Sequence, residues 1–421
     1  MPLLRPLRAL RYGANHLDRL DRLISPATAG EPGDRTQVGD VDENSVRRLV
    51  RGDHGPLAGD DEPTFTHAAR LLERWKQDGV LVRDPRPAYY AMEQDDGVAR
   101  RGLICLVRLA PFEEGIVLPH EETRGGSKEQ LLAQLRATET QLSLVMGIVP
   151  DRAGALRDFL SSRQGWPLVD VVDGTGVRNR LWREEDPAVQ LALSQALRDE
   201  QVVIADGHHR YESALAWQAD HVGRGHRERP TDWVMMLLVP VDDPGLRCHP
   251  SHRVLEEPLS PQAERELAAL ERDFEVEELA DAAAMEEFLR NPGGHRFGLV
   301  RPGRRMGLRL RDDADLSSVP EALRDVDAEL AHRLLLDPLG WSGDAGQTGR
   351  SGSAWGHNRS TAEQVSERVL AGDASLALLM RPPRPAQVLR VAQAGAVMPP
   401  KSTNFMPKPA KGIVMASLKS F

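Results

Sequence analysis

Hydrophobic residues along this chain fall into short unbroken runs and into longer segments of helical spacing. The unbroken runs are rich in Val, Ile, Leu and Met, which is typical of buried β-strands, and occupy residues 102–109, 145–149, 202–205, 233–239 and 376–380. Apolar residues three and four positions apart predict helices over residues 64–79, 127–142, 188–198, 211–219, 360–372 and 385–392. Strands and helices in this mixed order predict an α+β fold.

Smaller elements are expected between these segments. Turn residues at 173–176 and 302–303 predict two β-hairpins, and further helices are expected over residues 261–274, 282–289 and 320–336. Residues 343–350 form a Gly-rich loop, but Arg350 stands where a P-loop has Lys followed by Ser or Thr. We expect three regions: an N-terminal α+β region (1–100), a core (101–245) and a C-terminal α+β region (246–421).

The apolar run at 202–205 leads into an unusual turn, Asp206-Gly207-His208-His209-Arg210. Asp-Gly breaks the strand, and a helix is expected to follow directly. A strand-to-helix turn presents backbone N–H groups at the helix N-terminus, which favours an anion there. An acid, two imidazoles and a guanidinium in one turn therefore indicate a phosphate site. The alternative is a solvated turn in which Arg210 pairs with an acid.

A second polar segment lies before another predicted helix. His120, Glu121, Glu122 and Thr123 precede Ser127, which with the Gln three residues later has the spacing of a capping box. The local architecture matches that of the Asp206 turn, and a carboxylate here can accept a substrate proton. The alternative is a set of solvated loop charges without chemistry.

The C-terminal region contributes two further candidates for anion binding. Lys401-Ser402-Thr403 and Lys408 lie between prolines that stiffen the loop, and they offer point charges and hydroxyl donors to phosphate. We expect this loop to share one anion site with the Asp206 turn; a disordered basic tail is the alternative. The pair His252-Arg253 favours an anion over zinc, because no second ligand pair accompanies it. The alternative for this pair is a packed loop.

Composition narrows the function classes. A net charge of -9 and a pI near 5.9 disfavour broad nucleic-acid binding, which depends on neutralising phosphates. No apolar stretch approaches the roughly 20 residues that span a bilayer, and residues 1–20 lack the apolar core of a signal peptide. Two cysteines, Cys105 and Cys248, fit a reducing cytoplasm. Four of the six lysines lie in the last 21 residues, where a flexible point charge is useful.

The Asp206 turn and the ending Lys401-Ser402-Thr403…Pro407-Lys408 resemble the DUF1015 family, with support from residues 120–123 and 343–346. The Asp-Gly-His-His-Arg turn is also similar to the phosphate-binding turn of the ParB/sulfiredoxin fold, which includes partition CTPases and kinases of free serine. The resemblance implies an α+β protein with a ParB/sulfiredoxin-like core and additional α+β subdomains. Where family members carry Tyr-Phe-Tyr, this chain has Asn404-Phe405-Met406, which indicates a different substrate or lost activity.

The resemblance implies a nucleotide-dependent phosphotransferase of the small-molecule kinase type. Its acceptor would be a small hydroxyl-bearing metabolite such as serine, and its cofactors would be ATP or ADP, with CTP as a further candidate, and Mg²⁺. Catalytic roles then go to Glu121, Glu122, Asp206 and His209, with Asp206 also a metal ligand. Phosphate binding goes to Gly207, His208, Arg210, His252, Arg253, Lys401, Ser402, Thr403 and Lys408. Substrate contacts go to His120, Thr123 and Gln347.

Two other functions remain open on the sequence. One is a nucleotide-gated, ParB-like binding protein; the acidic charge and the lack of a recognisable DNA-reading helix count against it. The other is a non-catalytic scaffold for a pathway, which the missing tyrosines favour. The partners expected are a nucleotide and a small molecule, not a membrane.

Overall fold

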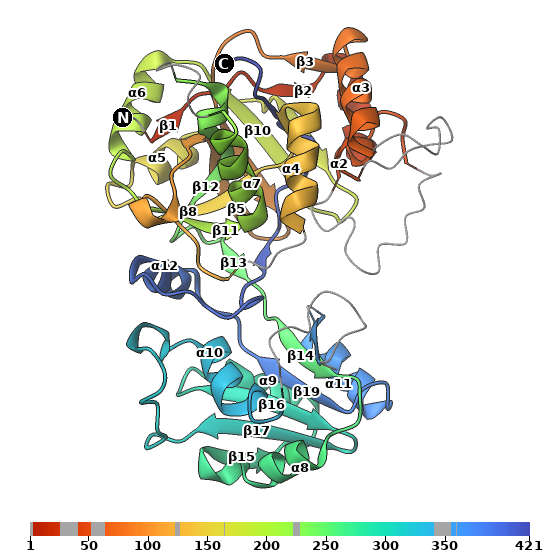
Figure 1. The fold of residues 1–421 in the computed structure, drawn as a ribbon, viewed down its shortest axis with the longest axis vertical. Helices are drawn as coiled ribbons and strands as arrows, with labels where there is room; N and C mark the ends of the chain where they lie inside the picture. Colours follow the sequence, from red (N-terminus) through yellow and green to blue (C-terminus); the bar gives the residue numbers. More distant parts are fainter. Residues whose placement is uncertain are drawn as a thin grey trace. The chain divides into compact units, whose positions relative to one another are not determined.

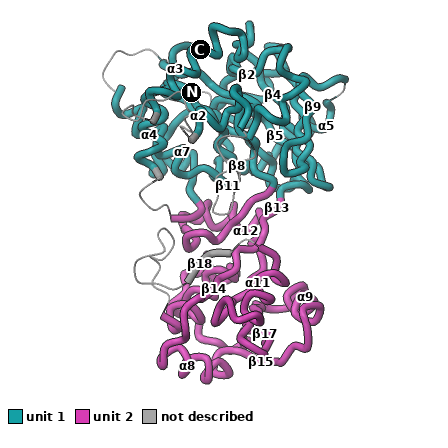
Figure 2. The backbone as a smooth tube through the Cα atoms, turned by 90° about the vertical axis from the view of Figure 1, so that its right-hand side faces the viewer, with its two compact units in different colours: residues 1–119, 123–246, 407–421 teal, residues 120–122, 247–406 magenta. Residues whose placement is uncertain are grey.

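A computed structural model of the chain describes residues 3–25, 41–51, 64–122, 127–163, 165–221, 228–340, 355–358 and 360–421. The contacts within it divide the chain into two compact units (Figure 2). Unit 1 comprises residues 1–119, 123–246 and 407–421, and unit 2 comprises residues 120–122 and 247–406. Each unit is mixed α+β, as the pattern of apolar runs predicts.

Unit 1 is built on a mixed sheet of nine described strands (Figure 1). Their order is β6 (Val117–Leu118), β11 (Val202–Asp206), β8 (Val145–Val149), β12 (Trp233–Pro240), β5 (Ala99–Arg108), β4 (Tyr89–Asp95), β10 (Arg178–Glu184) and β9 (Val169–Val172), with β1 (Leu4–Arg5) beside β5. β11 pairs in parallel with β6, β12 pairs in parallel with β8, and the other neighbours are antiparallel. The apolar runs of unit 1 form the central strands of this sheet. Unbroken apolar runs are typical of strands that are covered on both faces.

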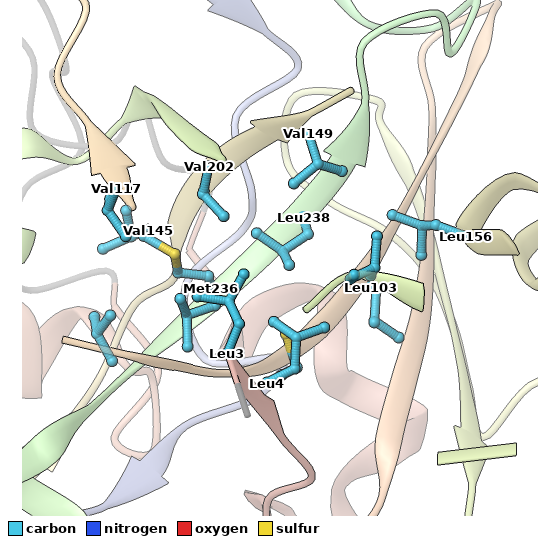
Figure 3. Packing of buried hydrophobic residues seen from close by; sticks show 14 of the residues in the cluster. Leu3, Leu4, Leu103, Val117, Val145, Val149, Leu156, Val202, Met236 and Leu238 are labelled. Atoms are coloured by element: carbon cyan, nitrogen blue, oxygen red, sulfur yellow. The ribbon is translucent and has the colours of Figure 1, made fainter. Parts of the chain in front are cut away.

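Helices of unit 1 bury the alternate residues of these strands. The described helices are α1 (Leu20–Leu23), α2 (Arg47–Arg51), α3 (Thr64–Gln77), α4 (Ser127–Thr138), α5 (Ala155–Ser161), α6 (Pro187–Ala196) and α7 (His208–Ala219). α7 packs against β8 and β12 and lies beside α4, which in turn contacts α3. Leu103 of β5 and Met236 and Leu238 of β12 pack in one cluster with Val202 and with Leu156 of α5 (Figure 3). The expected helices at 64–79, 188–198 and 211–219 are confirmed.

Unit 1 also contains two small strand pairs. β2 (Leu10–Tyr12) pairs with β3 (Leu81–Arg83), and β7 (Thr140–Gln141) pairs with β21 (Ala416–Ser417). β21 is shorter than the strand expected over 413–418. Its pairing places the last residues of the chain in the same unit as the first.

Unit 2 contains an antiparallel sheet of six described strands. Their order is β15 (Phe274–Glu278), β17 (Arg304–Leu310), β16 (Arg296–Arg301), β19 (Leu376–Met380), β14 (His252–Leu255) and β18 (Trp355–Asn358). The described helices are α8 (Pro261–Ala268), α9 (Ala282–Arg290), α10 (Asp327–Ala331), α11 (Ala362–Leu370) and α12 (Pro385–Gln393). α9 and α11 pack together on the sheet around one apolar cluster. A separate pair joins β13 (Arg247–Cys248) to β20 (Phe405–Met406).

Several expected boundaries in unit 2 were wrong. The helix expected over 261–274 ends at Ala268, because Phe274 begins a strand in which buried Phe274 and half-buried Val276 alternate with exposed Glu. The helix expected over 320–336 is broken into short 3₁₀, α and π segments. The helix expected over 360–372 begins at Ala362, and Thr361 with Gln364 forms its capping box.

Two structural features bear on the composition. Cys105 and Cys248 are both buried free thiols. Among the described residues, no helix has both the length and the apolar character that crossing a bilayer requires.

Candidate functional site

The Asp206 turn of unit 1 joins the end of β11 directly to the start of α7. Gly207 is the helix N-cap with φ of 95°, a left-handed conformation that glycine adopts without strain. The first helical hydrogen bond runs from the Tyr211 N–H to the Gly207 carbonyl, at 3.0 Å. The backbone N–H groups of the three preceding residues, His208 to Arg210, therefore form the positive end of the helix.

Asp206 is held between two cations at this helix end. Its Oδ1 lies 3.2 Å from the Lys408 Nζ, and its Oδ2 accepts a hydrogen bond from the Arg210 guanidinium. The Arg210 guanidinium also donates to the Leu144 carbonyl. Burial alone would raise the pKa of Asp206, but the charges of Arg210, Lys408 and then His208 lower it below its usual range. The structure thus brings together residues 202 positions apart in the chain and keeps this carboxylate ionised.

A buried polar chain behind Asp206 was missed by sequence reasoning. The Arg100 guanidinium donates to the Gln94 side-chain oxygen, and the Gln94 Nε2 donates to the Lys408 carbonyl at 3.1 Å and to Asn179 at 2.9 Å. Arg100 is only 1% exposed, and burial lowers its pKa to about 10 while Asp243, Asp96 and Asp206 act in the opposite direction. Neither Gln94 nor Arg100 lies within the strand predicted over residues 102–109, so the local sequence pattern gave no signal for these contacts.

A substitution at Gly207 tests the structural role of the turn. A Cβ at this position would lie 2.8 Å from the Arg210 Nε and 2.9 Å from its Cζ, so Gly207→Ala displaces the guanidinium that holds Asp206. Gly97→Ala is the matched control, since Gly97 also has positive φ but an added methyl group there would meet only open space. We expect Gly97→Ala to cost about 1–2 kcal/mol from backbone strain.

Gly207→Ala should cost at least about 1 kcal/mol more than the control, because a charge-assisted hydrogen bond is disturbed. Urea denaturation of both variants measures the difference. Equal costs would show that the guanidinium moves aside without loss.

A second cluster of predicted residues lies in unit 2. His120 is fully buried, and its Nε2 lies 2.7 Å from the Thr403 Oγ1. The His120 ring packs edge-on against the Phe405 ring. The backbone carbonyl of His120 accepts a hydrogen bond from the Met398 N–H at 2.8 Å. Glu121 forms the neighbouring β-bridge to Met398, and its Oε2 lies 4.0 Å from the His120 Nε2. This short segment is thereby fixed to the loop that carries Lys401-Ser402-Thr403.

Arg253 supports the same loop from within the unit. It is fully buried and donates to the Ser251 carbonyl at 2.7 Å and to the Lys401 carbonyl at 3.4 Å. Burial lowers the pKa of Arg253 to about 10, and the charge of Glu121 acts in the opposite direction. Lys401 has φ of 60°, an uncommon conformation for a residue with a Cβ. The Ser402 hydroxyl donates to the Pro399 carbonyl at 2.6 Å, so this hydroxyl closes the turn while the Lys401 side chain stays exposed.

The remaining predicted residues have different surroundings. His252 is buried, and its Nδ1 accepts the Met380 N–H at 3.1 Å; burial, then the charge of Arg253, lowers its pKa to about 4. It is therefore a neutral core histidine at pH 7. Glu122 is exposed. Thr123 and Gln347 lie outside the described residues.

His209 completes the turn in unit 1. Its Nδ1 lies 3.9 Å from the Glu212 Oε2, and its side chain is partly exposed at the start of α7. His208 is buried beside it. The structure thus places Asp206 to Arg210 with Lys408 in unit 1, and His120 to Glu122, His252-Arg253 and Lys401-Ser402-Thr403 in unit 2.

The residues around Asp206 do not make a metal centre by themselves. Within the described ranges, no group of three or more His, Cys, Asp or Glu side chains is arranged to hold a metal ion. Both oxygens of Asp206 are ion-paired with cations, whereas Mg²⁺ takes oxygen ligands at about 2.0–2.1 Å in near-octahedral geometry. The donor set present therefore suits an anion better than a divalent cation.

The chain belongs to the DUF1015 family, whose model, described as a protein of unknown function (DUF1015), matches residues 4–329. No significant match exists among curated proteins.

The solved structures that align with this chain are distant. A free serine kinase in complex with AMP aligns with 13% identity and a TM-score of 0.38, covering 75% of this chain and 91% of that chain. A variant of a free serine kinase in complex with ADP aligns with 12% identity and a TM-score of 0.39, covering 75% and 92%. A conserved hypothetical protein from Pyrococcus furiosus aligns with 12% identity and a TM-score of 0.36, covering 76% and 97%.

Proposed function

We propose that this protein is a nucleotide-dependent phosphotransferase whose acceptor is a small hydroxyl-bearing metabolite, with serine as the first candidate. The observation that carries the proposal is the Asp206–Lys408–Arg210 cluster at the N-terminus of α7. The proposal includes a ParB/sulfiredoxin-like core for unit 1, and the position of the cluster at a strand–turn–helix supports it.

The charges of the cluster favour phosphate. One carboxylate faces two side-chain cations, which leaves an excess of one positive charge, and the helix N-terminus adds a partial positive charge. Arg210 donates to both Asp206 and the Leu144 carbonyl, so we assign it the task of fixing the turn. Lys408, a flexible point charge, and the N–H groups of the turn are then the phosphate-binding groups. His209, partly exposed beside them, is a further donor.

The reaction assigned is transfer of the terminal phosphoryl group of ATP. A bond forms between the acceptor hydroxyl oxygen and phosphorus, the bond from phosphorus to the bridging oxygen breaks, and ADP leaves. The hydroxyl proton passes to a carboxylate. Glu121, which is fixed by the Met398 bridge, and the exposed Glu122 both belong to unit 2, so neither is assigned this role at the cluster of unit 1. Cations beside the transferred group neutralise its charge.

The experiment is a nucleotide and acceptor screen on the full chain. Thermal shifts with ATP, ADP and CTP, each with Mg²⁺, report nucleotide binding, because a ligand that binds only the folded state raises stability. Mass spectrometry then follows phosphate gain by serine, threonine and other hydroxyl compounds. We expect a shift with an adenine nucleotide and a singly phosphorylated acceptor.

Other outcomes separate the alternatives. Nucleotide binding without phosphate transfer, combined with a nucleotide-dependent gel shift of DNA, would replace the kinase with a nucleotide-gated binding protein. No shift with any nucleotide would exclude both and would favour the scaffold.

A further inference from the structure

Unit 2 contains a second candidate site that the proposed function does not use. A cavity of about 370 Å³ lies where the loop before β16, the start of α10 and the start of α12 meet. This volume is at the small end of the range for small-molecule pockets. Three prolines form an apolar part of its wall. Its polar lining comes from His295, Asp325, Asp327, Arg381, Arg384 and Gln387.

One wall of this cavity is a fixed His–Asp–Arg chain. The His295 Nδ1 lies 2.7 Å from the Asp327 Oδ1, and Arg381 contacts both oxygens of the same carboxylate, at 2.7 and 3.2 Å. Asp327 is an acceptor only, so the His295 Nδ1 carries the hydrogen of this bond. In the neutral ring the other nitrogen, Nε2, is then an acceptor. No described residue bonds to Nε2, although His295 lines the cavity.

A second arginine of the lining provides a cation. Arg384 is exposed at the N-cap of α12, and among the described residues no carboxylate pairs with its guanidinium. Arg381 and Arg390, by contrast, are paired with Asp327 and Asp325. Like the unbonded ring nitrogen, the Arg384 guanidinium has no contact that a purely structural role would explain.

Two members of this His–Asp–Arg chain of side chains have a structural role. Arg381 donates to the Asn291 carbonyl at 3.1 Å and to the Gly294 carbonyl at 2.8 Å, so it holds the loop before β16. Asp327 neutralises Arg381 and starts α10. These contacts account for the positions of Arg381 and Asp327. These contacts do not involve the His295 Nε2 or the Arg384 guanidinium, which both belong to residues that line the cavity.

We propose that this cavity binds a small hydroxy or amino carboxylic acid. The carboxylate of such a ligand pairs with Arg384, whose planar fork matches a carboxylate. Its hydroxyl or amino group donates a hydrogen bond to the His295 Nε2. Asp325, at the rim, is a second acceptor suited to an ammonium group. The site lies wholly in unit 2 and does not depend on the phosphotransfer assigned to the Asp206 turn.

Calorimetry of the full chain tests the site with L-serine, L-aspartate and L-lactate as probes, and with acetate and inorganic phosphate as comparisons. We expect at least one of the first three to bind, and Arg384→Ala to weaken that binding at least tenfold. Arg290→Ala is the matched control, because Arg290 is an exposed arginine of the same unit paired only with Glu286. It should leave the affinity unchanged.

Two further variants make the result decisive. His295→Phe should weaken the same ligand at least tenfold; if this variant fails to fold, Arg384→Ala alone carries the test, since its side chain makes no described ion pair. Lys408→Ala should leave the affinity unchanged, which separates this site from the proposed kinase site. The proposal is overturned if none of the three acids binds, if only phosphate or acetate binds, or if Arg384→Ala binds as tightly as the native protein.

Discussion

Replacing Lys408 with alanine is expected to weaken nucleotide binding by about a hundredfold or more. Lys408 lies 3.2 Å from Asp206 and is largely buried, with 13% of its side chain exposed. Its removal deletes a cation and also leaves the Asp206 carboxylate to repel the phosphate groups. Truncating one partner of such a charge pair costs about 2–5 kcal/mol, and a hundredfold loss corresponds to about 2.7 kcal/mol.

Lys419→Ala is the control for this prediction. Lys419 belongs to the same unit and the same C-terminal segment, but its Nζ pairs with Glu73 at 3.1 Å and half of its side chain is exposed. Calorimetric titration with ATP should therefore give native affinity for Lys419→Ala. If Lys408→Ala bound ATP as tightly as this control while circular dichroism showed a native fold, the cluster around Asp206 would not be a phosphate site. The proposed function would then lose its support.

The Asp206 turn shows which structural features local sequence patterns can predict. The run Val202 to Ala205, the Asp-Gly break and the following helical spacing are all properties of neighbouring residues, and the structure has β11, the turn and α7 where they indicate. Gly207 takes the positive φ that the break requires. The strands over 145–149 and 233–239 and the helices over 64–79 and 188–198 were predictable for the same local reason. α2 and α5 were not predicted.

Local sequence patterns could not predict the contacts between segments that are distant in the chain. The Gln94 side chain bonds to the Lys408 carbonyl across 314 positions, and nothing near either residue in the sequence indicates this partner. No strand was predicted at β14, because its four residues are too few to show alternation and two of them, His252 and Arg253, are of types that are usually exposed. Its strand state comes from pairing with β18 and β19, more than 100 positions later in the chain.

The same pairing changes the interpretation of the two residues. As loop residues, His252 and Arg253 would be available to an anion. As residues of a central strand they are buried, and their polar atoms bond to the Met380 N–H and to the Ser251 and Lys401 carbonyls. Arg253 thus positions the loop that presents Lys401, and His252 contributes to the stability of unit 2 in a pH-dependent way.

Unit 2 is expected to lose about 3 kcal/mol of stability on acidification to pH ~4 because of His252 alone. Its pKa is lowered by burial to about 4 in the folded protein, against about 6.5 in an unfolded chain. At pH values between these two pKa values, the unfolded chain therefore binds a proton that the folded protein does not bind. The contribution of the neutral ring is fully present above pH ~6.5 and is lost as the pH falls toward 4.

His252→Asn tests this expectation, because the asparagine oxygen can still accept the Met380 N–H but does not titrate between pH 7 and 4. Urea denaturation at both pH values, with hydrogen exchange at the Met380 amide as a local probe of β19, should show a smaller acid loss in the variant by about 3 kcal/mol. Exposed His249 provides the control, and His249→Asn should keep the native pH dependence. An unchanged acid loss in His252→Asn would mean that the ring is protonated in the folded state, and only then would an anion beside Arg253 be favoured again.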